Sequence, residues 1–389
     1  MDVAGLRAQI PACQAMTYLN TGWSGPNPVS VVEAMKSRLD YEMIQGPTSP
    51  EVYQSGREVR TKLREAVAGL LNASPDEICL TRNTTEGLNI VINGLPWREG
   101  DEIVTCDLEH SSVLVPSYYQ QQRHGAVVKV VPIATAESPD VILDKIETAL
   151  TGRTRLVFLS HIEYSCGLRL PAKEIRALTR ERGILLMLDG AQTAGHIPLD
   201  MRDIDCDFYS IAGQKWLLGP QGVGALYIRR DLIPLVQPVH VAGGAALPMD
   251  NPYSFLPVES SIDKFSPTST SVPIQAGLMK AIKFARNVGL AEIESRNLDL
   301  AGDLKRGLQE TPGVKVLSPL ERRSSSGLVS FTIDGVAPAD AVARLWERHR
   351  IVVRPVTYPS CIRVSLHYFN TEEEVDQLVG AVGLLAAGQ

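Results

Sequence analysis

Apolar residues follow two alternating patterns over the first 230 residues of the chain. One pattern repeats at helical spacing and predicts helices over residues 29–44, 51–71, 84–95, 110–125, 141–150 and 171–183. The other is a short apolar run and predicts strands over residues 77–82, 101–107, 127–133, 154–162 and 184–190. Strands that alternate with helices indicate βαβ units and a mostly parallel sheet. The runs LVFL and ILLML contain no polar residue, which is typical of strands buried on both faces.

The pattern changes after about residue 230. Residues 237–257 are rich in Pro and Gly, so we expect a loop over a site there. A long helical region follows at 275–310, and shorter strands and helices are predicted at residues 314–319, 326–333, 339–350, 351–356, 361–367 and 371–385. We therefore expect an α/β protein with a large domain over residues 15–269 and a smaller α+β domain over residues 270–389. Residues 1–14 are expected to pack near the small domain.

The composition is that of an ordinary globular protein, because 44% of the 389 residues are hydrophobic and 21% are charged. A net charge of −6 argues against nucleic acid or an anionic membrane as the main partner, since basic patches bind those surfaces. We find neither a membrane-spanning apolar run nor a signal-peptide pattern. The six cysteines lack the spacing of metal ligands, so we expect reduced thiols, no metal and a cytoplasmic location.

Three positions, each after an apolar run of the chain, suggest a cofactor site. Asp189 ends an apolar strand, where a buried acid is costly unless a cation pairs with it. Lys215 lies in a small-residue turn, where a lysine can form a Schiff base with an aldehyde. Thr84 and Thr85 open a predicted helix, and such a terminus binds phosphate. Each residue alone has an ordinary structural interpretation, but the three in this order predict pyridoxal 5′-phosphate (PLP).

Longer motifs extend this pattern over nearly the whole chain. They are TTEGLNIV, LEHSSVLVP, LSHIEYSCG, LDGAQTAGHIPLD, DCDFYSIAGQKWLLGPQGVGALYI and IRVSLHYFNTEEEVDQL. On these motifs the sequence resembles the class V aminotransferase family of PLP enzymes, which includes the cysteine desulfurases. The resemblance implies the type I fold of PLP-dependent aminotransferases and a homodimer whose active site lies at the interface.

The resemblance also implies roles for individual residues. In the cofactor site, Lys215 would be the Schiff-base lysine and catalytic base, and Asp189 would pair with the pyridinium nitrogen. Gln192 would bind the ring hydroxyl, and His110, the second expected catalytic residue, would stack on the ring. The expected phosphate ligands are Thr84, Thr85, Gln214 and, across the dimer, Ser269. The expected substrate contacts are Arg363, Arg354, Asn20 and Tyr164, of which Arg354 could equally be structural.

The chain departs from the family pattern at three places. Ala212 stands where the family often has a phosphate-binding hydroxyl, and Gln214 stands in place of a histidine. Tyr164 replaces a common asparagine, although its hydroxyl can still donate a hydrogen bond. The motif around Ser269 is loosened, so the resemblance there is weaker than elsewhere.

The connection over residues 355–360 decides between reactions. A desulfurase needs a nucleophilic cysteine on a mobile loop, and this connection is short and has none. We expect a structural or site-lining role for Cys361 and a filler role for Cys166. The chain is most similar to cystine and cysteine C–S lyases, which carry out β-elimination to pyruvate, ammonia and persulfide or sulfide.

Three alternatives stay open from the sequence alone. One is a cysteine desulfurase that passes sulfur to an iron–sulfur cluster assembly acceptor. Another is an amino-acid epimerase of the isopenicillin-N-epimerase type, with Tyr164, Tyr118 or Tyr119 as the second base. The last is a non-catalytic scaffold, which would have no need of Lys215 or Asp189.

Overall fold

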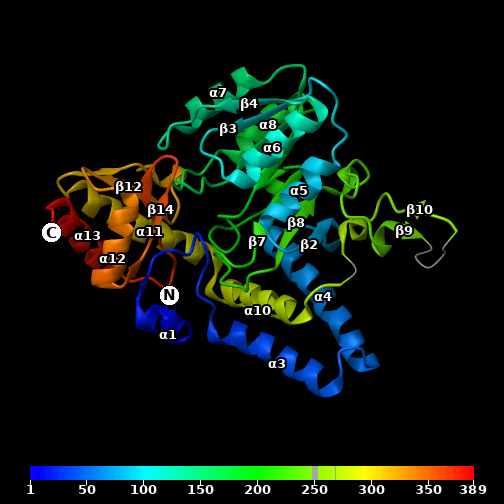
Figure 1. The fold of residues 1–389 in the computed structure, drawn as a ribbon, viewed down its shortest axis with the longest axis horizontal. Coiled ribbons are helices and arrows are strands. Elements are labelled where there is room, and N and C mark those ends of the chain that lie inside the picture. The colour runs from blue at the N-terminus through cyan, green and yellow to red at the C-terminus, as the bar shows by residue number, and fades with distance from the viewer. Residues whose placement is uncertain (248–252, 268) are drawn as a thin grey trace.

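The computed structural model describes residues 1–247, 253–267 and 269–389. A seven-stranded sheet with its helices forms a large unit, and a four-stranded sheet with its helices forms a small unit beside it (Figure 1). The strands of the large sheet, in spatial order, are β2 (Ile78–Thr81), β8 (Gly224–Ile228), β7 (Phe208–Ala212), β6 (Leu185–Asp189), β5 (Thr154–Ser160), β3 (Glu102–Cys106) and β4 (Val127–Val131).

The large sheet is parallel from β7 through β4, and only β8 runs against its neighbours. The predicted α/β fold with a mostly parallel sheet is therefore confirmed. β7 and β8 were not predicted as separate strands. Their hydrophobic runs lie within a longer glycine-rich motif, and only pairing in the sheet separates them.

Helices cover both faces of this sheet, because alternate strand residues point to opposite sides. Leu156 and Phe158 face a core with α5 (Thr84–Gly94) and α6 (Ser111–His124). Val157 and Leu159 face a second core with helices on the other side. Those helices are α4 (Pro50–Leu71), α7 (Pro139–Ala149), α8 (Ala172–Glu181) and α10 (Val272–Val288). Burial on both faces explains why β5 and β6 are continuous apolar runs.

The small unit is an antiparallel sheet with helices on it. Its strands, in spatial order, are β11 (Val314–Val316), β12 (Leu328–Ile333), β15 (Cys361–Ser365) and β14 (Arg354–Val356). The helices in its core are α11 (Leu290–Gln309), α12 (Pro338–His349) and α13 (Glu372–Ala386). β13 (Ile351–Val352) pairs instead with β1 (Thr17–Tyr18) near the N-terminus.

Helix α10 bears on where the two units divide. It packs against α3 (Val29–Gln45) and α4, and its Leu278 and Ile282 lie in a core of the large sheet. The expected boundary at residues 269 and 270 stays a prediction, and this packing favours a boundary after α10. Near the N-terminus, Arg7 donates to the Phe369 carbonyl (2.8 Å) and pairs with Glu374 (2.9 Å). Residues 1–14 thus contact the small unit as well as the large core.

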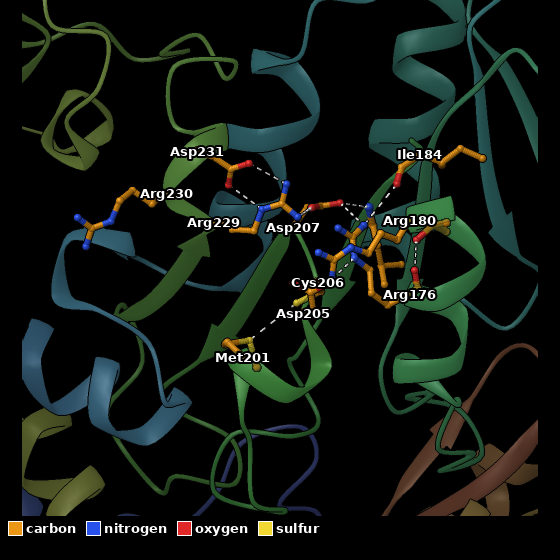
Figure 2. A network of polar contacts seen from close by, with 12 residues as sticks. Arg176, Arg180, Ile184, Met201, Asp205, Cys206, Asp207, Arg229, Arg230 and Asp231 are labelled. Atoms are coloured by element: carbon orange, nitrogen blue, oxygen red, sulfur yellow. Dashed lines mark hydrogen bonds and ion pairs between the residues drawn. The ribbon is translucent and has the colours of Figure 1, made fainter. Parts of the chain in front are cut away.

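An ion-pair network anchors the amino ends of β6 and β7 (Figure 2). Asp207 is buried directly before β7, and its carboxylate accepts hydrogen bonds from Arg176 (2.9 Å) and the Leu186 amide (2.7 Å). Arg229 pairs with the other carboxylate oxygen. A buried carboxylate with this many donors is a structural anchor, because its desolvation is offset by charge-assisted hydrogen bonds.

The predicted loop at residues 237–257 lies only partly within the described residues. Its described part includes β9 (Ala246–Leu247) and β10 (Leu256–Pro257), which pair as a short ribbon at one edge of the large unit (Figure 1). None of these described residues lines the candidate site of the same chain, and the expectation that this segment covers a site stays a prediction. No helix in the described ranges is long and apolar enough to cross a membrane.

Candidate active site

A cavity of about 220 Å³ lies at the carboxyl ends of β5, β6 and β7, and β14 and β15 of the small unit close it. Ligands of open α/β sheets bind at such an edge. All but two of the predicted site residues line it, namely Thr84, Thr85, His110, Tyr164, Asp189, Gln192, Gln214, Lys215, Arg354 and Arg363. A larger hollow of about 440 Å³ between α1 (Val3–Ala8) and α13 contains none of the predicted residues.

Lys215 and Asp189 are two oppositely charged groups that line the cavity. β7 ends at Ala212, and the chain then turns at Gly213, where a Cβ atom would lie 2.6 Å from the Val223 carbonyl oxygen. Burial lowers the pKa of Lys215 to about 8, with Asp189 opposing the shift. Burial likewise raises the pKa of Asp189, and Lys215 counteracts it. The ammonium group and the carboxylate therefore stabilise each other in a dry setting.

The carboxylate of Asp189 is poorly satisfied by the protein itself. Its Oδ1 accepts a hydrogen bond from the Ala191 amide (2.8 Å), and no side chain of the described residues donates to it. The residue is only 5% exposed. A buried carboxylate with so few donors suits a cationic ligand atom.

The start of α5 offers donors for an anion. The Asn83 side chain caps this helix by accepting from the Glu86 amide (2.9 Å), and Thr84 and Thr85 follow. The hydroxyl of Thr85 forms a hydrogen bond with Ser112 (2.8 Å), whereas the buried hydroxyl of Thr84 has no partner among the described residues. The side-chain oxygen of Gln214 is also buried without a partner. The first amides of this helix and the Thr84 hydroxyl are donors that fit a phosphate, whereas the Gln214 oxygen is an acceptor, so Gln214 would fit one only through its amide nitrogen.

His110 also lines the cavity. Its Nδ1 accepts a hydrogen bond from the Ser112 amide (3.1 Å) and so caps α6. Burial, with the positive charges of Lys215 and two arginines, lowers the pKa of His110 to about 4. The ring is neutral at pH 7, and the ring of Tyr164 meets it edge-on at 4.9 Å. A neutral imidazole suits stacking on an aromatic ligand.

Arg363 and Arg354 form the small-unit wall of the cavity. They are directly opposite each other on β15 and β14. Arg363 is fully buried and donates to the Tyr164 carbonyl (2.9 Å) and weakly to Asn20 Oδ1 (3.4 Å), while its Nε has no partner in the part of the chain that the structure describes. Burial lowers the pKa of Arg363 to about 9, which leaves it cationic at pH 7. Arg354 packs on the ring of Trp23 at 4.5 Å.

Two predicted site residues do not line the cavity. Asn20 is buried behind it and contacts it only through Arg363. Ser269 is exposed, and its predicted role in a partner's site stays a prediction. Among the candidate second bases, Tyr118 and Tyr119 are about half exposed on α6 and lie outside the cavity, so only Tyr164 remains.

The cysteines lie away from the chemistry. All six are buried, and none lines the cavity. Cys361 Sγ contacts the Ser165 carbonyl at 3.9 Å, and burial raises its pKa to about 11. Burial raises the pKa of Cys166 to about 12. Neither thiol has the low pKa or the access of a nucleophile.

A second group of acids behind the cavity was missed by the sequence analysis. Ser160, which lines the cavity, donates from its amide and its hydroxyl to the two oxygens of Glu109, each at 2.6 Å. Cys106 and Glu163 lie beside Glu109. The Cys106 sulfur and one carboxylate oxygen of each glutamate are within 4.8 Å of one another. Burial and Glu109 raise the pKa of Glu163 well above its usual range. Ser160 already donates two hydrogen bonds to Glu109. A proton on Glu163 therefore explains how two buried acidic side chains can lie side by side.

The sequence profile of the aminotransferase class-V family matches residues 17–378. This chain belongs to that family. Among its class-V relatives, a probable cysteine desulfurase of Methanothermobacter thermautotrophicus is 31% identical over 98% of this chain and 97% of that protein. The isopenicillin N epimerase of Amycolatopsis lactamdurans is 31% identical over 97% of each chain.

This class-V chain also superposes on solved structures over nearly its whole length. The cystine C–S lyase C-DES, in complex with its reaction product cysteine persulfide, superposes with a TM-score of 0.90. It shares 31% identity over 96% of this chain and 99% of that one. A C-DES mutant with glycine covalently linked to its PLP cofactor superposes with a TM-score of 0.89, at 31% identity over 97% of this chain and 98% of that chain.

Proposed function

We propose that this chain is a PLP-dependent C–S lyase that carries out β-elimination on L-cystine or L-cysteine. The observation that carries the proposal is the content of the cavity. It combines Lys215, Asp189 and two arginines, and it contains no cysteine thiol. This set can bind an amino acid by its carboxylate and move a proton, but it offers no sulfur nucleophile.

The donor set fits PLP along its whole length. Thr84, Thr85 and the first amides of α5 would hold the phosphate, and Asp189 would pair with the ring nitrogen. His110 and Gln192 would contact the ring. When bound, PLP supplies an electron sink that makes the Cα–H bond of an amino acid acidic.

The protein's own groups then perform binding and proton transfer. Arg363 would bind the substrate carboxylate, because its fork of N–H donors matches two oxygens and its Nε is free. Lys215 would take the proton from Cα, and the electron pair of that bond expels the sulfur at Cβ. From cystine the leaving group is cysteine persulfide. The other product, aminoacrylate, is hydrolysed to pyruvate and ammonia.

The connection between β14 and β15 supports elimination over desulfuration. β14 ends at Val356 and β15 begins at Cys361, so only residues 357–360 join them. Four extended residues reach about 13 Å at most, and none of these is cysteine. In elimination the sulfur leaves with the electron pair of the Cβ–S bond, so no enzyme thiol is needed.

Epimerisation is a second candidate, because the isopenicillin N epimerase relative matches over nearly the whole chain. That reaction needs a base on each side of Cα. Tyr164 lines the cavity beside His110 and is the available second base. Burial raises the pKa of Tyr164, so its phenol stays protonated at neutral pH and cannot take a proton from Cα, which favours the lyase.

The test is to incubate the PLP-loaded protein with L-cystine and, separately, L-cysteine, without reductant. We expect pyruvate together with persulfide or sulfide, and none with Lys215→Ala. Alanine as the product would instead establish desulfuration. Conversion of an L-amino acid to a racemic mixture with solvent deuterium at Cα would establish epimerisation.

The proposal includes a homodimer. α3 and α4 form one edge of the molecule (Figure 1), and they expose apolar side chains there. Leu39, Met43 and Ile44 on α3 and Tyr53 on α4 are 54–75% exposed. Such a patch is typical of an interface. Cytoplasmic location and transfer of sulfur to an iron–sulfur assembly acceptor stay predictions.

The dimer is tested by light scattering on a double substitution, Met43→Glu with Ile44→Glu. We expect a monomer, with the matched surface change Leu320→Glu remaining a dimer. A wild-type protein that is an active monomer in solution would contradict the proposal.

A further inference from the structure

Resting on the proposed function, we propose that Trp216 is a positioning residue that fixes the amide of Gln192 in the cofactor cavity. Trp216 follows Lys215 directly and is fully buried. Its indole Nε1 donates a hydrogen bond to Gln192 Oε1 at 2.8 Å. The indole N–H can only donate, so this contact determines which end of the amide is oxygen.

Gln192 has little freedom once this contact is made. It is 3% exposed, and its Nε2 donates to the Gly22 carbonyl at 3.0 Å. An amide nitrogen carries two hydrogens, so one N–H remains for the cavity that Gln192 lines. Without the indole donor, only the Gly22 carbonyl would favour this orientation, so the amide would turn over more readily and offer an acceptor in place of this N–H. Trp216 therefore helps to determine that Gln192 offers a ligand an N–H donor and not its side-chain oxygen.

Two buried histidines hold Trp216 in place. The ring of His196 stacks on the indole with centroids 3.7 Å apart and planes 13° from parallel. His196 Nδ1 donates to the Gln192 carbonyl (2.8 Å), and its Nε2 accepts from the Gly327 amide (2.8 Å). Burial lowers the pKa of His196 to about 3, so the ring is neutral as these contacts require.

The second histidine connects Trp216 to the small unit. His367 Nε2 donates to the Trp216 carbonyl at 2.9 Å, and Asn297 Nδ2 faces His367 Nδ1 at 3.2 Å. Gly327, Asn297 and His367 all belong to the small unit, whereas Gln192 and Trp216 belong to the large one. The Gln192 amide is thus held from both units.

The first experiment measures the visible absorbance band of the PLP-loaded protein against pH. An N–H donated to the anionic ring oxygen makes that oxygen less basic. We expect Trp216→Phe, which keeps an aromatic ring for His196, to move the midpoint of the titration upward by about half a pH unit or more. The charged and titratable groups that line the cavity stay in place: Asp189, Lys215, His110, Tyr164, Arg354 and Arg363.

A double-substitution cycle separates positioning from general damage. In a Gln192→Ala background, Trp216→Phe should produce no further shift, because its effect passes through that amide. The matched control is Trp97→Phe, since Trp97 also donates its indole N–H, to the Ile92 carbonyl at 2.6 Å, but lies outside the cavity. This control should keep the wild-type midpoint. An unchanged midpoint in Trp216→Phe, or an equal shift in both backgrounds, overturns the inference.

A second measurement needs no cofactor. The chain has four tryptophans, so each indole N–H can be assigned in the cofactor-free protein by nuclear magnetic resonance. We expect Gln192→Leu to speed the hydrogen exchange of the Trp216 indole at least tenfold and to leave Trp97 unchanged. An unchanged Trp216 signal contradicts the contact itself. Failure of the wild-type protein to form a visible band with PLP would count against the proposed function instead.

Discussion

Asp189 and Asp207 lie at opposite ends of the same sheet and meet opposite environments. Both are nearly fully buried, with 5% and 1% exposure. Asp207, at the amino ends of the strands, accepts from Arg176 and the Leu186 amide and pairs with Arg229. Asp189, at the carboxyl ends, accepts from one backbone amide and faces the cavity.

The difference shows which end of the sheet is built for stability and which for binding. Around Asp207, the buried charge is offset by donors within the protein (Figure 2). Around the cavity, Asp189 accepts one backbone hydrogen bond only, and the Thr84 hydroxyl and Arg363 Nε have no partner among the described residues. Unsatisfied buried groups cost stability, and a ligand that pairs with them recovers it. The comparison predicts that changes at the two ends affect different properties.

The largest effect is expected from Lys215→Ala. Removing the base and the cofactor attachment should reduce turnover by about 10⁴-fold or more and abolish the visible band. The unfolding temperature of the cofactor-free protein should fall, because Asp189 loses the ammonium group that counteracts its burial. Substantial turnover by this variant would show that another group is the base.

The sharpest comparison is between Asp189→Asn and Asp207→Asn. The first should reduce turnover by about 100-fold or more, because an amide cannot stabilise a cationic ring nitrogen. The second should lower the free energy of unfolding by about 3 kcal/mol, because Arg176 and Arg229 lose the charge of the buried carboxylate that both contact, and should leave turnover per folded molecule unchanged. Denaturant unfolding and steady-state rates measure both. Equal stability losses in the two variants would contradict the comparison.

Arg363→Lys and Arg354→Lys should both raise KM for L-cystine, and the first should raise it more. Arg363 is fully buried and offers a free Nε, so losing its fork should raise KM for L-cystine about 10- to 100-fold. Arg354 is only partly buried against Trp23, so its substitution should raise KM less. A larger effect at Arg354 would move the main carboxylate contact to that residue.

The smallest effect is a pH dependence of cofactor capture. Lys215 must be neutral to react with the aldehyde of PLP, and its pKa is lowered to about 8. The rate at which the cofactor-free protein gains the visible band should therefore rise with pH and level off above about 8. Because Asp189 raises the pKa of Lys215, Asp189→Asn should move this rise to lower pH. Stopped-flow absorbance measures both curves.

Much of the fold could be predicted from hydrophobic periodicity. The predicted helices and strands of the first 190 residues correspond to α3 through β6. The apolar runs of β5 and β6 could be read as buried strands because each is covered on both faces. The split of the long region at 275–310 into α10 and α11 was not predicted. Gly289 ends the first helix there, and the two helices pack into different units.

The site was predictable to a similar degree, and for a similar reason. Ligand groups at the ends of successive strands come together at one sheet edge, so Thr84, Asp189 and Lys215 could be grouped from their order alone. Trp216 and the Glu109–Glu163 pair could not be found in that way. Their roles depend on contacts between segments that are distant in sequence, such as Ser160 with Glu109.

The sequence by itself determined the α/β fold, the family and most of the residues that line the cavity. These follow from periodicity and from motifs that are local in the chain. Only the tertiary structure decided that Asp207 is satisfied and Asp189 is not, that no thiol lines the cavity, and that the small unit holds Trp216. The physical reason is that burial and hydrogen bonding depend on which distant segments pack together, and that packing is not encoded at any single position.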